Sequence, residues 1–504
     1  MKIQPGAAVE TGKPNRIRRD CVSYREPSRV VISRSGRTEL FSRNKLGLGD
    51  ILPRLQLPHS IYHTATMPSF DHGSHRNLNR RHAIGILSAL AVTGCGSSSE
   101  PTPDNKPSGE RRDVPLRIVF DGSEDDAAAI RRAYGTEAEQ SLQITAIDSS
   151  QAGQIESIID AVRNSDVAIV SHALIGTLIA NETIVDINQE VLDDIASNHG
   201  PLLPALEHSF GRYDGLRWGV AAGAKPLAVL SLDPDLTLEN WADYHTWLGD
   251  KKGKSGEPLA TSWAANSFLN RCALTIDRAW LFDRLTLKAQ INQPEYVEQL
   301  QALLADSKLY ASTEMTPAMI YNGIRQGELK GGIAFQTPIT AAAPDASAEF
   351  FDVSATACPN ETETERLWLG RQTLIACVST GCRQTEASRR FVGWISGTPS
   401  HSTLTQQTEL VSPTRTPRES TVGGQLTGYA RWAKEQLNTS LVVSGPWLPN
   451  GTEYYQVLDD QVRRCIGGET DPQAALNQVA ERWNEISDRN GIEKQTAAWK
   501  KLDV

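Results

Sequence analysis

The chain has 504 residues, of which 39% are hydrophobic and 22% are charged, a composition typical of globular proteins. Its formal net charge of −9, together with the lack of a basic stripe with interleaved aromatic residues, argues against a nucleic-acid-binding surface. No run of 18 or more apolar residues occurs, so the sequence predicts no segment that spans a membrane.

The N-terminal part predicts an export signal. Residues 1–66 show no sustained periodicity, so we interpret them as disordered and as an over-long gene start. A conventional signal begins at Met67, where Arg80 and Arg81 precede a short uncharged apolar run. Basic residues, a short apolar run and small residues after it predict a signal peptide over 67–94, by the Sec or the twin-arginine route.

The signal ends in Val92-Thr93-Gly94-Cys95, which resembles the bacterial lipobox. The resemblance implies cleavage before Cys95, a lipid on its thiol, and attachment to the membrane outside the cytoplasm through that lipid. The alternative is a short buried helix that ends in Gly-Cys. A polar stretch containing Pro follows at once, so we predict a flexible tether over 95–113.

Beyond the tether, strands that alternate with helices predict an α/β fold with parallel-type sheets. The first strand is expected at Leu116–Phe120, and the apolar run Val167–Val170 is typical of a buried parallel strand. Ligands in such sheets lie beyond the carboxyl ends of the strands. Asp121, Ser171 and His172 occupy these positions and are therefore candidate ligand-binding residues.

Hydrophobic periodicity predicts the remaining elements in chain order. Strands are expected at 219–222, 228–232, 332–335 and 374–378. Helices are expected at 125–134, 155–162, from 240, at 296–304, 317–326 and 386–395, and from 472 to 490, where Asp471 caps the start.

The cysteine pattern indicates neither a zinc site nor a disulfide scaffold. No CxxC pair occurs, and five cysteines follow Cys95, so at least one is unpaired or pairs between chains. We expect buried free thiols for most of them. A short Cys377–Cys382 bridge stays open. The five are Cys272, Cys358, Cys377, Cys382 and Cys465.

No catalytic motif is present: the chain has no G-x-S-x-G elbow, no H-E-x-x-H and no phosphate-binding loop. Asp121, Ser123 and Asp125 imitate the start of a calcium loop, but Asp126 replaces its glycine, so a helix N-terminus is the better interpretation. Tyr454-Tyr455 is interpreted as one packed and one exposed ring. We predict no cofactor, no metal and no enzymatic activity. A carboxylate pair for glycoside hydrolysis stays open, because its separation is a three-dimensional quantity.

Aromatic residues are the remaining functional signal. Eleven Trp occur, and several stand at predicted strand ends or in loops instead of on apolar helical stripes. An indole face suits the C–H face of a sugar ring, although core packing is the default for any single Trp. As a group they predict a polar cleft with aromatic walls. The residues concerned are Trp218, Trp263, Trp368 and Trp447, with Asn266 and Gln336 nearby in sequence.

The order of motifs from Leu116 to Lys501 resembles the extracellular solute-binding proteins of ABC importers, the sugar-binding group that includes maltose-binding protein. The segments that carry the resemblance are 166–171 (DVAIVS), 213–220 (YDGLRWGV), 238–241 (LENW), 324–335, 388–396 (SRRFVGWIS), 412–415 (SPTR) and 475–483. The resemblance implies a two-lobed periplasmic-binding-protein fold of type II, with lobes joined by crossover strands.

By this resemblance, lobe 1 comprises 114–222 plus 366–413, and lobe 2 comprises 223–365 plus 414–504. A monomer would hold a sugar in the cleft and deliver it to permease subunits without chemistry. The resemblance also places Trp263, Asn266, Phe335, Gln336, Trp368 and Arg371 at the ligand. Two alternatives stay open: an exported glycan-active enzyme, and a sensor with this fold but no dedicated permease.

Overall fold

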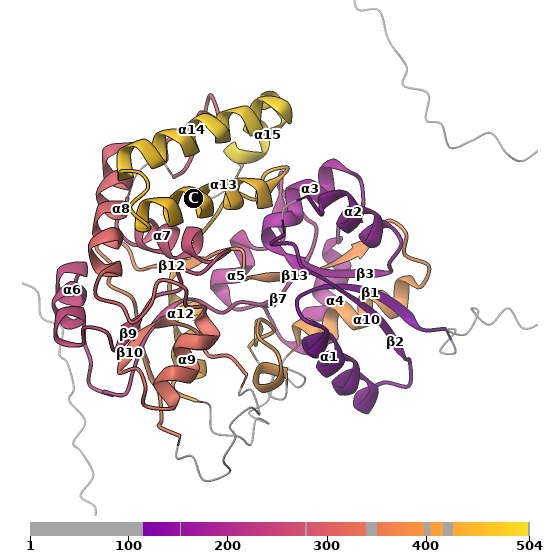
Figure 1. Cartoon of the computed structure of the whole chain (residues 1–504). Coiled ribbons are helices and arrows are strands. Elements are labelled where there is room, and N and C mark those ends of the chain that lie inside the picture. The colour runs from indigo at the N-terminus through magenta and orange to yellow at the C-terminus, as the bar shows by residue number, and fades with distance from the viewer. Residues whose placement is uncertain are drawn as a thin grey trace, which may run out of the picture. The chain divides into compact units, whose positions relative to one another are not determined.

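The computed structural model describes residues 114–151, 153–277, 280–338, 350–397, 404–416 and 427–501. The predicted signal peptide, the tether and Cys95 lie outside these residues. Two separate sheets with helices packed around them organise the described part of the chain (Figure 1). No helix in these ranges is long and apolar enough to cross a membrane.

The first lobe is the part built on a six-stranded sheet. Its strands are β1 (Leu116–Asp121), β2 (Leu142–Ile147), β3 (Val167–Ser171), β4 (Ile184–Val185), β7 (Val220–Gly223) and β13 (Leu374–Ser379), in the order β2-β1-β3-β13-β4 with β7 beside β13. The surrounding helices are α1 (Glu124–Glu137), α2 (Ile155–Arg163), α3 (Ile175–Ala180), α4 (Gln189–His199) and α10 (Thr385–Ser396), with the short 3-10 helix η1 (His172–Leu174) and the hairpin β5 (Arg212–Tyr213) and β6 (Leu216–Arg217). The short helix α5 (Pro204–Ser209) packs on elements of the second lobe.

The second lobe is the part built on a four-stranded sheet, in the order β11-β8-β10-β9. These strands are β8 (Ala228–Ser231), β9 (Ser255–Gly256), β10 (Gly331–Ala334) and β11 (Ser354–Thr356). A smaller parallel pair joins β12 (Arg366–Leu369) to β14 (Leu441–Ser444). The helices are α6 (Trp241–Asp250), α7 (Ala264–Ala273), α8 (Pro294–Ser307), α9 (Pro317–Arg325), α12 (Gly428–Thr439), α13 (Gly451–Ile466), α14 (Pro472–Arg489) and α15 (Ile492–Lys500).

Both main sheets are mixed, with parallel and antiparallel neighbours. Strands β1, β2 and β3 are parallel, but β13 runs antiparallel to β3, β4 and β7. In the second lobe β8 is antiparallel to both β10 and β11. The chain enters β13 after passing through the second lobe, so it comes to the sheet from the opposite direction to the βα units before it.

Four chain segments, three of which pass between the two sheets, meet at Lys225. This residue lies between β7 and β8, and its side chain is buried. Its Nζ donates to the carbonyl of Gln336 (3.1 Å), just after β10, and to that of Thr408 (3.3 Å). Gln372, between β12 and β13, donates to the Lys225 carbonyl (3.4 Å). The predicted lobe boundaries themselves stay predictions.

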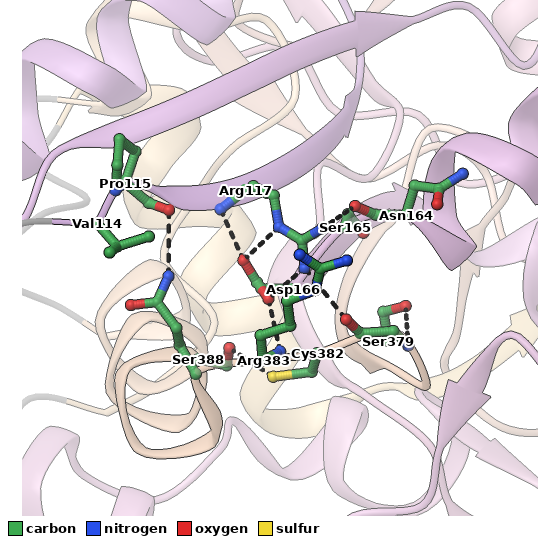
Figure 2. Close-up of polar contacts among 12 residues, drawn as sticks. Val114, Pro115, Arg117, Asn164, Ser165, Asp166, Ser379, Cys382, Arg383 and Ser388 are labelled. Atoms are coloured by element: carbon green, nitrogen blue, oxygen red, sulfur yellow. Dashed lines mark hydrogen bonds and ion pairs between the residues drawn. The ribbon is translucent and has the colours of Figure 1, made fainter. Parts of the chain in front are cut away.

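Within the first lobe, Asp166 lies directly before β3 and holds neighbouring strands together at this end of the sheet (Figure 2). Its fully buried carboxylate accepts hydrogen bonds from the backbone N–H (3.0 Å) and from the Nε (3.0 Å) and Nη2 (2.7 Å) of Arg117, and from the Arg383 N–H (2.8 Å). Burial raises the pKa of Asp166, but the hydrogen bonds from Arg117 and Arg383 outweigh burial and hold it below its usual value. β1, β3 and the turn after β13 therefore meet at one carboxylate.

Asp166→Asn is expected to destabilise the protein by about 2 kcal/mol. The amide has no negative charge, and its NH2 group would face N–H donors of Arg117 and Arg383 that now bond to the carboxylate. The urea midpoint measures the loss. Asp160→Asn is the matched control, since its ion pair with Arg163 is exposed and is expected to contribute less than about 1 kcal/mol. Equal losses in the two variants would contradict this role for Asp166.

Candidate functional site

A cleft of about 180 Å³ collects residues from the first lobe, the second lobe and the segment that crosses between them. The first lobe contributes residues at the carboxyl ends of three parallel strands: Asp121 at the end of β1 with Gly122 after it, Asp148 to Ser150 after β2, and Ser171 at the end of β3. Ser262 and Trp263 come from the second lobe. The rest of the lining is Arg371, Gln372, Leu374, Glu409 and Leu410.

Asp121 organises the first-lobe side of this cleft. Its carboxylate accepts hydrogen bonds from the N–H of Ser149 (3.0 Å), the hydroxyl of Ser149 and the N–H of Ser171 (3.1 Å). The hydroxyl of Ser171 in turn donates to the carbonyl of Arg371. The ends of β1, β2 and β3 are thus joined to the crossing segment, as expected where parallel strands end at one edge of a sheet.

Asp148 is held by its own turn. Its carboxylate accepts from the N–H (2.9 Å) and hydroxyl of Ser150 and from the Gln151 amide (3.0 Å). Burial raises the pKa of Asp148, but these hydrogen bonds, with a smaller contribution from the positive charge of Arg371, lower it below its usual value. Asp148 is therefore an ionised acceptor at the cleft.

The second-lobe wall is Trp263, which immediately precedes α7. Its ring is half-buried and packs against Phe335, with ring centroids 5.6 Å apart. The carboxylate of Asp459, on α13, accepts from the N–H groups of Ser262 (2.9 Å) and Ala265 (3.1 Å) on either side of Trp263. Ser262 has a φ of 73°, a left-handed conformation that is costly for a residue with a side chain and is often found at functional sites.

A buried ionic cluster fixes the far end of α7. Arg271 is fully buried and pairs with Glu257 and, at 2.8 Å, with Asp306. Its guanidinium also lies 4.4 Å from the centroid of the Trp241 ring. Because both ends of α7 are fastened, Trp263 stands on a rigid support, and rigid supports position binding groups more accurately than mobile loops do.

Arg371 supplies a guanidinium to the cleft. Within the described ranges no hydrogen bond or ion pair is formed by its side chain, although its charge acts on Asp148 and Asp459. Arg presents several donors in a planar fork, which suits ligand oxygens. Glu409, also in the lining, is mostly buried, and burial together with the nearby Asp126 raises its pKa.

The ten predicted ligand residues divide into three groups. Four of them line this cleft: Asp121, Ser171, Trp263 and Arg371. Four more form supports behind it: Phe335 packs on Trp263, Gln336 accepts from the Thr427 hydroxyl, Trp368 donates to Asn266 (3.1 Å), and the Asn266 amide donates to Gln372 (2.6 Å).

The other two lie elsewhere. His172 is buried between Phe210 and Trp447, with ring centroids 4.3 and 4.6 Å away. Trp218 donates to the carbonyl of Tyr213 (3.2 Å) and packs on the core. Local sequence identified their positions at strand ends, but tertiary packing buries His172 and turns Trp218 toward the core.

Sequence reasoning missed Asp148, Ser149, Ser150, Ser262 and Glu409. The first three follow β2, a strand whose alternation of Leu142, Ile144 and Ala146 could have revealed it. For Ser262 and Glu409 we find no local signal. Tyr454 and Tyr455 are both buried, which corrects the expectation that one is exposed.

Among the cysteines, the five in the described residues are free, including Cys377 and Cys382. At the predicted helix start Ser123 accepts from the Asp126 N–H, which confirms a helix N-terminus in place of a calcium loop. Nowhere in the described ranges do three or more His, Cys, Asp or Glu gather in a group that could hold a metal ion.

Two larger hollows lie within the second lobe alone, between α13 and α14 and beside Trp280 and Trp499. We favour the smaller cleft as the site, because it joins both lobes and gathers serine hydroxyls, carboxylates, a guanidinium and one aromatic ring.

No protein-family model matches the chain, and a comparison with curated proteins found no match. Solved structures are similar, at low sequence identity. The GacH receptor of Streptomyces glaucescens GLA.O is 17% identical, with 74% of this chain and 98% of that chain covered and a TM-score of 0.56. An ABC transporter solute-binding protein from Agrobacterium radiobacter K84 is 15% identical, with 74% and 98% covered and a TM-score of 0.57. Maltose-bound T. maritima MalE3 is 13% identical, with 74% and 100% covered and a TM-score of 0.57.

The chain has the two-lobed fold of these binding proteins. This confirms the fold that the motif order predicted. Segment by segment, the strands β1, β3, β10 and β13 and the helices α2, α9, α10 and α14 occur where the sequence predicts them, within a few residues at each end.

The protonation of His172 gives a prediction for stability. Burial, and then the charge of Arg217, lower its pKa to about 3. Below pH 6.5 the unfolded chain binds a proton that the folded chain does not, so the free energy of unfolding falls as the pH falls from about 6.5 toward 3. The loss is expected to reach about 2 kcal/mol at pH 5 relative to pH 8. Urea denaturation should give a flatter pH dependence for His172→Gln; identical pH dependences would contradict the assignment.

Proposed function

We propose that the protein is a solute-binding component of an ABC importer that captures a carbohydrate in the cleft between its lobes. The observation that carries the proposal is the pairing, across one cleft, of the Trp263 ring with hydrogen-bonding groups at the ends of three strands. Sugars present an apolar C–H face and a rim of hydroxyls, so they need both kinds of wall.

The solved structures support this proposal by analogy of fold. The GacH receptor is described in complex with acarbose, the Agrobacterium radiobacter K84 protein in complex with ribitol, and MalE3 as maltose-bound. Each of these ligands carries several hydroxyl groups. Fold alone does not imply function, so the residues of the cleft carry the argument.

Binding in this fold would close the two lobes over the solute. The segments that cross between the sheets pass beside the cleft, since Arg371 and Gln372 line it and Gln372 bonds to Lys225. A ligand that touches both Ser149 and Trp263 would stabilise the closed arrangement of the lobes by its contacts. Delivery to permease subunits would follow from recognition of that closed arrangement.

The chemistry of the cleft favours binding over catalysis. Asp121 and Asp148 each accept three hydrogen bonds from neighbouring protein groups. Carboxylates held by this many protein donors are fixed in place, so they are poorly suited to exchange protons with a substrate. We therefore propose a protein that is not an enzyme.

The export signal completes the proposal. We infer that the mature protein begins at Cys95, carries lipid there, and acts as a monomer on the outer side of the cytoplasmic membrane or at the cell surface. The tether over 95–113 would leave the lobes free to meet both solute and permease.

Trp263→Ala is expected to weaken binding of the carbohydrate that stabilises the wild-type chain most in a thermal-shift panel. The loss of ring contact corresponds to about 2 kcal/mol, roughly thirtyfold in Kd. Trp247→Ala is the matched control, because Trp247 is also half-buried but stacks on Tyr244 in α6, away from the cleft.

Two results would count against the proposal. The first is an absence of stabilisation by any mono- or oligosaccharide in the wild-type protein. The second is equal loss of binding in both Trp variants. Release of product from any glycoside by the purified chain would favour the enzyme alternative instead.

Cys95→Ser is expected to move the protein from the membrane fraction to the soluble extracytoplasmic fraction, because the serine hydroxyl cannot take the thioether-linked lipid. Cell fractionation with immunoblotting measures this, and mass spectrometry of the wild-type mature chain identifies its first residue. Cys382→Ser, at a free and partly exposed cysteine of the described residues, serves as the control. Membrane retention of Cys95→Ser would overturn the anchoring proposal.

A further inference from the structure

The volume of the cleft limits what it can hold. Its volume of about 180 Å³ lies below the range of about 300–1,000 Å³ that is typical of pockets for drug-sized ligands, which favours a ligand of about one sugar ring over a chain of rings. The larger hollows beside Trp280 and between α13 and α14 do not extend it, because they share no lining residue with it.

The cleft also offers a single aromatic platform. A bound chain of sugars gains most when each ring meets its own flat surface, as stacking is a short-range contact. Of the aromatic residues that the sequence placed near the ligand, Trp263 alone lines the cleft within the described ranges. Phe335 and Trp368 are fully buried behind it.

Charge restricts the ligand further. The lining holds three carboxyl groups, Asp121, Asp148 and Glu409, and one guanidinium, Arg371. A carboxylate has about four acceptor sites, and Asp121 and Asp148 each use three on the protein, so each keeps one for a ligand hydroxyl. An anionic ligand could pair with Arg371 but would also face these carboxylates, and like charges repel strongly in a poorly solvated cleft.

We propose that the cleft is selective for one neutral polyhydroxylated unit, a monosaccharide or a polyol of that size, over oligosaccharides and over acidic sugars. Trp263 would support the ring, Arg371 would donate to its oxygens, and Asp121 and Asp148 would accept from its hydroxyls. This inference rests on the proposed carbohydrate-binding function and adds the size and charge of the ligand.

The test is isothermal titration calorimetry of the chain from residue 95, without lipid. Single units are D-glucose, D-galactose, D-mannose, N-acetyl-D-glucosamine and ribitol; matched longer sugars are maltose, lactose, maltotriose and chitobiose; matched acids are D-glucuronate and glucose 6-phosphate. We expect at least one single unit to bind at least tenfold more tightly than its longer or acidic counterpart. That ligand should lose at least tenfold in affinity in Arg371→Met and in Trp263→Ala, but not in Trp247→Ala.

The outcomes separate the two proposals. Tighter binding of a disaccharide or trisaccharide than of its single unit would overturn the size limit while leaving carbohydrate binding intact. Tighter binding of glucuronate or glucose 6-phosphate would overturn the charge selectivity. If no sugar of any length or charge binds to the wild-type chain, the proposed function fails, and this inference fails with it.

Discussion

The buried ammonium of Lys225 is the constraint on which the arrangement of the two lobes depends. Carbonyls from two other segments accept its hydrogen bonds, and the Gln372 amide donates to its own carbonyl. Burial lowers the pKa of Lys225 to about 8, although the nearby Glu409 and Asp126 oppose that shift. A charged group that far from water persists only where several acceptors surround it, so these segments keep a fixed mutual position. Glu409, whose charge acts on Lys225, also lines the cleft. The buried lysine and the candidate site therefore share one carboxyl group.

The two sides of the cleft are each held by buried hydrogen bonds. The ends of β1, β2 and β3 meet beside the crossing segment. There the Asp121 carboxylate accepts hydrogen bonds from Ser149 and Ser171, and the Ser171 hydroxyl donates to the carbonyl of Arg371. On the other side, α7 is held at its start by Asp459 and at its end by the Arg271 cluster, which aims Trp263 from a fixed support. Preorganised groups lose little entropy when a ligand arrives. A small polar site with one aromatic wall can therefore be selective.

Local rules predicted much of this fold from the sequence. The apolar run at Val167–Val170, the spacing of residues in α2 and the Asp471–Pro472 start of α14 all depend on neighbours in the chain. The order of weak motifs then supplied the two-lobed arrangement, which no single motif contains. Strand direction was harder, since the antiparallel pairing of β13 depends on the route of the chain through the second lobe.

Site residues were predictable where a strand end or a position in the family's motif order fixes them. Asp121 and Ser171 follow from the rule about carboxyl ends of strands, and Trp263 and Arg371 from family position. Trp368 and Asn266 were also predicted as ligand contacts, but their polar groups bond to each other within the protein, an outcome that only the packed structure reveals. The most direct measurement is a crystal structure of the chain with its tightest-binding carbohydrate. The account predicts density for one ring on the Trp263 face, within hydrogen-bond distance of Arg371 and the Ser149 loop; density beside Trp280 and Trp499 instead, with an empty cleft, would contradict it.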